Sequence, residues 1–200
     1  MEQRPLRDRF FQDHARKIVM DERGRTRVEY VYEGDYYTAE LTDRQWNVRK
    51  AGLLALLLAS AALLLSAMMT EIRPNHAQDV VLMEAVTLFL LLGDCVGMAS
   101  RLAHGRRLQK QEYRLAVKTL TECSFLAVCV LAALLLDLAV SLLAGRWAWE
   151  PPALGFLVRV VLLLAAQLGA AVLVRRERYA TQASHDMPHG IDITNDFVNF

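Results

Sequence analysis

Four long apolar runs constrain this chain more than any other feature. They cover residues 51–69, 80–100, 123–143 and 154–174, and each is close to the roughly 20 residues that an α-helix needs to cross a bilayer. Four buried helices of a soluble core are the alternative, but a chain of 200 residues is too short to surround them. The runs therefore predict an all-α polytopic membrane protein with four transmembrane helices.

The distribution of positive charge predicts the orientation of these helices. Of the 23 Lys and Arg residues, 20 lie before the first run, between the second and third runs, or after the fourth. Only Arg73 and Arg146 lie in the two other connections. Because basic loops stay on the cytoplasmic side, we expect an integral protein of the plasma (inner) membrane with both termini in the cytoplasm. Its basic segments could attract anionic lipid at that face.

The first 42 residues are polar but patterned, and they predict a small cytoplasmic α+β module. Arg7–Ala15 carries two phenylalanines among charged residues, which is typical of a short amphipathic helix. Strand-like residues bounded by turn signals predict three strands, at 17–21, 26–32 and 36–41. The turns between them favour a meander, in which each strand pairs with the next one along the chain.

These patterns divide the chain into three regions. The N-terminal module covers residues 1–42, the transmembrane bundle 43–178 and a cytoplasmic tail 179–200. Thr42 is a suitable N-cap for the helix that becomes the first span. The tail contains an alternating pair, Ile191 and Ile193, and could add a strand to the N-terminal sheet.

Three charged residues inside the apolar runs give the most specific site hypothesis. In the predicted topology Glu84, Asp137 and Arg159 lie about 6, 9 and 7 Å below the same outer boundary. Since intramembrane charges are costly unless paired, we expect Arg159 to face the bundle interior and to hydrogen-bond Glu84, Asp137 or both. The cluster could couple protons or cations, or it could be a clasp that fixes helix register. Alternatively, Arg159 could extend to the outer headgroups.

Two further polar residues lie in the cytoplasmic halves of their spans. Asp94 is about 9 Å from the end of the second span, and Gln167 of the fourth span lies within a turn or two of that depth. They could form an inner relay below the charge cluster. The favoured alternative is that the Asp94 carboxylate is hydrogen-bonded to a neighbouring helix or reaches the basic inner interface.

Small residues at helical spacing predict close helix contacts. They lie on the first span and on the fourth: Ala55, Ala59, Ala62 and Ser66, then Ala165 and Gly169 and, on a second face, Ala166 and Ala170. Such faces let helices approach closely in lipid. They could serve the bundle itself or contact another subunit in a homo- or hetero-oligomer.

The sequence contains none of the common signatures of soluble catalysis. It has no P-loop, no GxSxG, no HExxH and no Gly-rich dinucleotide motif, so we expect no catalytic residue, no cofactor and no nucleic-acid partner. Pro188 keeps His185 and His189 off one helical face, and we expect no metal site. The expected function is a non-enzymatic accessory, scaffold or regulatory subunit. The alternative is a small proton- or cation-coupled transporter that uses the intramembrane charges.

Overall fold

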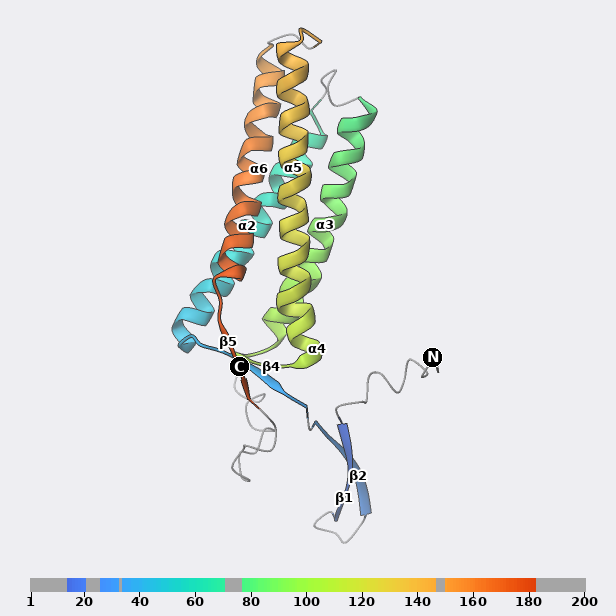
Figure 1. Ribbon diagram of the computed structural model, residues 1–200, viewed down its shortest axis with the longest axis vertical. Helices are drawn as coiled ribbons and strands as arrows, with labels where there is room; N and C mark the ends of the chain where they lie inside the picture. The colour runs from blue at the N-terminus through green and yellow to red at the C-terminus, as the bar shows by residue number, and fades with distance from the viewer. Residues whose placement is uncertain (1–13, 21–25, 33, 71–76, 147–149, 183–200) are drawn as a thin grey trace.

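Four long helices that run side by side make up most of the fold (Figure 1). The computed structural model describes residues 14–20, 26–32, 34–70, 77–146 and 150–182. Among these residues four helices are long and apolar enough to cross a membrane, as the four apolar runs predict. They are α2 (Asp43–Met68), α3 (Gln78–Ala103), α5 (Leu120–Leu143) and α6 (Pro151–Arg175).

Local sequence explains where two of these helices begin. Thr42 is the N-cap of α2, as expected, and its hydroxyl accepts a hydrogen bond from the Gln45 amide at 3.3 Å. The Gln45 side chain accepts in return from the Thr42 amide at 3.1 Å, which completes a capping box. Helix α6 begins with Pro151 and Pro152, where a missing amide hydrogen and a fixed φ angle suit the first turn.

The helices form a closed ring in the order α2, α3, α5, α6, because each packs mainly against two neighbours. Leucines on one face of each helix fill the centre, among them Leu57, Leu131 and Leu163. Large apolar side chains also cover the outside, where Phe89 is 76% exposed and Leu136 is 67% exposed. An apolar exterior of this kind suits hydrocarbon better than water.

Helices α3 and α5 are joined by a compact segment at one end of the bundle. It contains strand β4 (Arg107–Gln109), the single turn α4 (Lys110–Tyr113) and the π-helix η2 (Arg114–Thr119). The π-helix leads directly into α5, so the chain is helical from Lys110 to Leu143. Its packing against α3 places the Leu115 carbonyl oxygen 3.1 Å from where a Cβ on Gly97 would lie.

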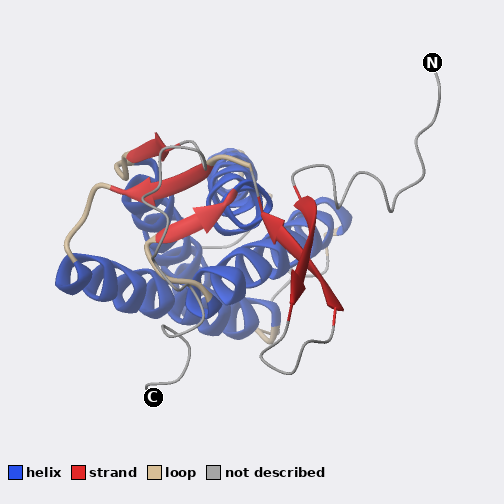
Figure 2. Ribbon diagram, turned by 90° about the horizontal axis from the view of Figure 1, so that it is seen from below, coloured by secondary structure: helices blue, strands red, loops and turns tan. Residues whose placement is uncertain are grey.

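A three-stranded antiparallel sheet lies at the same end of the bundle, which we call the sheet end (Figures 1 and 2). Its order is β4-β3-β5, with β3 (Tyr36–Ala39) in the centre and β5 (Tyr179–Gln182) on the other edge. Tyr37 is the register partner of both Leu108 and Thr181. The sheet therefore joins three segments that are distant in the sequence. The opposite end of the bundle is called the loop end.

The first two strands form a separate hairpin. Strand β1 (His14–Met20) pairs antiparallel with β2 (Thr26–Tyr32), with His14 opposite Tyr32 and Met20 opposite Thr26. Figure 1 shows this hairpin extending away from the bundle below the sheet end.

The predicted three-stranded meander is therefore wrong in its last pairing. All three strands form close to their expected positions, but β3 pairs with β4 and β5 instead of β2. The reason is tertiary: β4 follows the end of α3 and β5 follows the end of α6, so the helices bring both segments to β3. Turn residues such as Gly34 indicate where a strand ends, and they do not specify its partner.

The described residues cover only part of two further expectations, one for the N-terminal helix and one for the C-terminal tail. The predicted helix over 7–15 lies mostly outside the described residues, and its last two residues, His14 and Ala15, begin strand β1. The tail does add a strand to β3, at Tyr179–Gln182. Ile191 and Ile193 lie outside the described residues.

Candidate functional site

Arg159 does not form the predicted interaction with the intramembrane acids. Its Nη1 donates to the Thr70 hydroxyl at 2.8 Å, just after the end of α2. Among the described residues, neither Glu84 nor Asp137 forms an ion pair with it. The expected depth was compatible with a pairing, but α6 packs mainly on α2 and α5 and not on α3, which carries Glu84. Although α5 is a neighbour, Arg159 is directed to Thr70 and not to Asp137. The guanidinium therefore reaches toward the loop end, close to the alternative in which it extends to the headgroups.

The two acids of the predicted cluster have different surroundings. Glu84 is buried in α3 at 4% exposure, and its Oε1 has no hydrogen-bond partner. Asp137 on α5 is half-buried. The structure thus leaves one buried carboxyl oxygen of the predicted cluster unsatisfied, and a buried polar atom without a partner is costly.

Asp94 makes a helix-to-helix hydrogen bond, which is one of the two forms of the favoured alternative for it. Its Oδ1 accepts from the Ser124 hydroxyl of α5 at 2.9 Å, and both residues are fully buried. Its Oδ2 has no partner. Gln167 on α6 is also fully buried, and neither its amide oxygen nor its amide nitrogen has a partner.

A pair of glycines places Asp94 close to α5. A Cβ on Gly93 would lie 2.6 Å from the Cys123 sulfur, and one on Gly97 would lie 3.0 Å from the Leu120 Cβ. The two helices can approach this closely only because both positions lack side chains. The Gly-xxx-Gly spacing was visible in the sequence, but it was not among the predicted packing faces.

The predicted small-residue faces lie mostly outside the bundle core. On α2 every member of the face is exposed: Ala55, Ala59, Ala62 and Ser66. On α6, Ala165 is exposed, whereas a Cβ on Gly169 would meet Leu56 of α2 at 3.4 Å. Gly169 therefore serves the intramolecular contact that was one of the two expected roles, and so does Ala170, which is fully buried in the bundle core.

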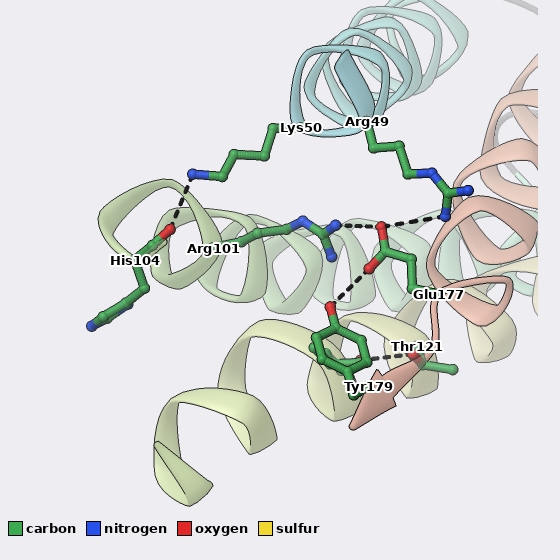
Figure 3. Close-up of polar contacts among 8 residues, drawn as sticks. Arg49, Lys50, Arg101, His104, Thr121, Glu177 and Tyr179 are labelled. Carbon is green, nitrogen blue, oxygen red and sulfur yellow. Dashed lines mark hydrogen bonds and ion pairs between the residues drawn. The ribbon is translucent and has the colours of Figure 1, made fainter. Parts of the chain in front are cut away.

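The most connected polar site lies at the sheet end and was not predicted. Glu177 follows α6, and its Oε1 accepts from Nη2 of Arg101 at the end of α3. Arg49 of α2 directs Nη1 toward the same oxygen at 4.0 Å, and the Tyr179 hydroxyl donates to Oε2 at 2.8 Å. Figure 3 shows both arginines converging on this one carboxylate. We call these residues, together with Trp46, the Arg101–Glu177 cluster.

The ion pair at the centre of the cluster is almost completely enclosed. The side chains of Arg101 and Glu177 are 0% and 2% exposed. The Arg101 guanidinium carbon lies 4.3 Å from the centre of the Trp46 ring, and Lys50 Nζ lies 5.6 Å from that centre. A cation over an aromatic face is stabilised electrostatically. Burial also raises the pKa of Tyr179, which keeps its hydroxyl protonated as a donor to Glu177.

Further contacts connect this cluster to the segment between α3 and α5. Lys50 Nζ donates to the His104 carbonyl oxygen at 3.0 Å. His104 Nε2 lies 3.0 Å from a Glu112 carboxylate oxygen, and the other Glu112 oxygen accepts from the Gln109 amide at 2.8 Å. The start of α2 is thereby fixed to the end of α3 and to α4.

Tyrosines pack the sheet against the bundle. The rings of Tyr37 and Tyr113 stack with centroids 4.3 Å apart, and Tyr113 meets Tyr179 edge-to-face at 5.1 Å. The guanidinium carbon of Arg107 lies 4.1 Å from the centroid of the Tyr36 ring. Burial raises the pKa of Tyr36, and the nearby Arg107 charge opposes that rise.

The sequence offered two signals for the Arg101–Glu177 cluster. Glu177 is the single acid in the basic segment 175–178, directly after the fourth span. Trp46 and Arg49 are three residues apart, so they share a face of the first helix. Neither feature identified Arg101 as their partner, because that contact depends on how α2, α3 and α6 meet.

The described residues contain no group of three or more His, Cys, Asp or Glu side chains that could hold a metal ion. His185 and His189 lie outside those residues. No protein-family model, curated protein or solved structure gives a significant match to this chain.

Proposed function

We propose that this chain is a non-enzymatic integral membrane protein that acts as an accessory, scaffold or regulatory subunit of the plasma (inner) membrane. The predicted orientation would put the sheet end in the cytoplasm, because the basic segments adjoin it. In that orientation both the sheet and the β1–β2 hairpin face cytoplasmic partners.

The observation that supports this function most directly is a β-hairpin whose last residue is fixed by hydrogen bonds to the sheet end of the bundle. In the part of the chain that the structure describes, β1 and β2 pair only with each other. A two-stranded hairpin is marginally stable alone, and its free edges can accept a strand from another protein. Strand edges that no other described strand pairs with suit binding better than they suit catalysis.

The base of the hairpin is attached to the sheet end through Tyr32. Its hydroxyl donates to the Asp35 carbonyl oxygen at 3.0 Å and accepts from the Lys110 amide at 3.2 Å. Its ring also meets Tyr36 edge-to-face at 5.0 Å. A partner bound to the hairpin would therefore be held at a defined position next to the membrane.

Site-specific photo-crosslinking in cells tests this function. A crosslinker at Lys17, which pairs with Glu29 in the middle of the hairpin, should capture one defined protein. Ile18→Pro, which removes a strand amide, should abolish that product without changing the thermal stability of the bundle. A crosslinker at the lipid-facing Leu136 is the control. If removal of residues 14–32 leaves every stable association intact, the proposal is wrong.

A proton or cation pathway is the second candidate, and one observation favours it. Three buried acceptor atoms inside the bundle have no partner: Glu84 Oε1, Asp94 Oδ2 and Gln167 Oε1. Protons, cations or water could satisfy such atoms. Reconstituted vesicles with a pH-sensitive dye test this candidate. Glu84→Gln and Asp94→Asn should then abolish flux while the exposed control Ser66→Ala retains it, and an absence of flux in the unmodified protein rules it out.

A further inference from the structure

The unsatisfied polar atoms at the sheet end are all hydrogen-bond donors. Nε and Nη1 of Arg101, Nη1 of Arg49 and Nε1 of Trp46 are buried and have no hydrogen-bond acceptor. The unsatisfied atoms of Glu84 and Asp94, deeper in the bundle, are acceptors. These four donors at the sheet end therefore have no acceptor within hydrogen-bond distance among the described residues.

The balance of positive and negative side chains at the sheet end also indicates a missing anion. Arg49 and Arg101 both point toward Glu177, and Lys50 lies over the same Trp46 ring as Arg101, so three cations adjoin one acid. Both oxygens of that carboxylate are already in use, Oε1 by Arg101 and Oε2 by the Tyr179 hydroxyl. The three cations therefore exceed the single anion, and a buried charge without full compensation is costly. An additional anion would reduce that cost.

The location restricts what the anion can be. Trp46, Arg49 and Lys50 occupy the first two turns of α2, just before its apolar stretch, where a membrane interface would lie. Arg49 is the accessible member, because its side chain is 31% exposed while that of Arg101 is 0% exposed. A ligand approaching from the interface would meet Arg49 and Lys50 first, with the Arg101 charge behind them.

We propose that the Arg101–Glu177 cluster and Lys50 form a binding site for a phosphate group, carried by the headgroup of an anionic phospholipid. The guanidinium of Arg49 and the ammonium of Lys50 contact the phosphate oxygens, and Arg101 supplies buried positive charge. Guanidinium groups recognise phosphate through paired, charge-assisted hydrogen bonds. This site is independent of the proposed partner of the hairpin.

Binding to the purified full-length protein in a neutral detergent tests the site. Native mass spectrometry and thermal unfolding are recorded with phosphatidylglycerol, with phosphatidylcholine and with inorganic phosphate. We expect phosphatidylglycerol to bind and to raise the unfolding temperature, with little effect of phosphatidylcholine. Arg49→Gln should weaken phosphatidylglycerol binding about tenfold, the order expected for one lost charged hydrogen bond.

Arg114→Gln is the matched control, because Arg114 is exposed at the same end of the bundle and loses the same charge. Size-exclusion profiles verify that each variant is folded, and Lys50→Gln provides a second variant of the site. Saturation by inorganic phosphate, lost in Arg49→Gln, would support the phosphate site with a soluble ligand as its source. If no phosphate-bearing probe binds, or if Arg49→Gln and Arg114→Gln weaken binding equally, the proposed site is wrong.

Discussion

Arg101 and Glu177, 76 residues apart in the chain, form a buried ion pair that joins the end of α3 to the segment between α6 and β5. The pair is enclosed by Trp46 on one side and by Tyr179 on the other. It connects three helices to the three-stranded sheet at a single carboxylate. The sheet end should therefore depend more on Glu177 than on any exposed charge near it.

The first prediction concerns the removal of that carboxylate charge. Glu177→Gln leaves the Arg101 guanidinium buried without its counter-ion, so we expect it to destabilise the fold by about 3–5 kcal/mol. Thermal unfolding in detergent measures the effect. Glu122→Gln is the control, because Glu122 is exposed near the same end. Equal unfolding temperatures for the two variants would contradict the assignment of Glu177 as the central residue of the cluster.

The second prediction concerns the close contact between α3 and α5. Gly93→Ala places a methyl group 2.6 Å from the Cys123 sulfur, and we expect it to destabilise the bundle by about 1–3 kcal/mol through overpacking. Gly155→Ala is the control, because nothing lies within 4 Å of a Cβ there. It should be neutral or slightly stabilising, since alanine is favoured over glycine in helices.

A double-mutant cycle makes this second prediction specific. Cys123→Ala removes the sulfur and leaves the Cys123 Cβ, which would be 3.5 Å from the new methyl group, an ordinary contact. The double variant Gly93→Ala with Cys123→Ala should therefore recover most of the lost stability. If the double variant instead loses as much stability as the two single variants lose together, the sulfur is not the atom that the methyl group meets.

The four helices could be predicted from sequence because they depend on one-dimensional properties. Run length determines which segments can span a bilayer, and the capping residues around Thr42 determine where α2 begins. Which face of each helix points inward is a different matter. Lipid and bundle core are equally apolar, so hydrophobic periodicity carries little information about rotation. This is why the Ala55–Ala59 face was a plausible packing face and is nevertheless exposed.

The same limit explains the outcome for Arg159. Helical rise gives the depth of a residue in its span, and depth suggested that Arg159 could meet Glu84 or Asp137. The order of helices around the ring and the rotation of each one decide the actual neighbour, which is Thr70. The Arg101–Glu177 pair could not be inferred either, because it requires three segment ends to meet at one point.

The third prediction concerns alkaline pH. Burial raises the pKa of Tyr179 above its ordinary value of 10.0, so the folded state holds the hydroxyl proton more tightly than the unfolded state. The resulting stability is fully present below that ordinary value and is lost as the pH rises above it. Tyr179→Phe has no such proton, so the stability advantage of the unmodified protein over this variant should shrink above about pH 10. Thermal unfolding of both proteins between pH 7 and 11 measures it, and a constant difference would contradict it.

The fourth prediction concerns orientation, on which the proposed cytoplasmic role depends. Gly105 and Ala144 are both exposed, the first beside the sheet and the second at the loop end of α5. In a background where Cys95, Cys123 and Cys129 are replaced by alanine, we expect a membrane-impermeant maleimide added to intact cells to label Ala144→Cys. Gly105→Cys should react only after the membrane is permeabilised, because the basic segments keep the sheet end inside. The opposite labelling would invert the topology and place the hairpin outside the cytoplasm.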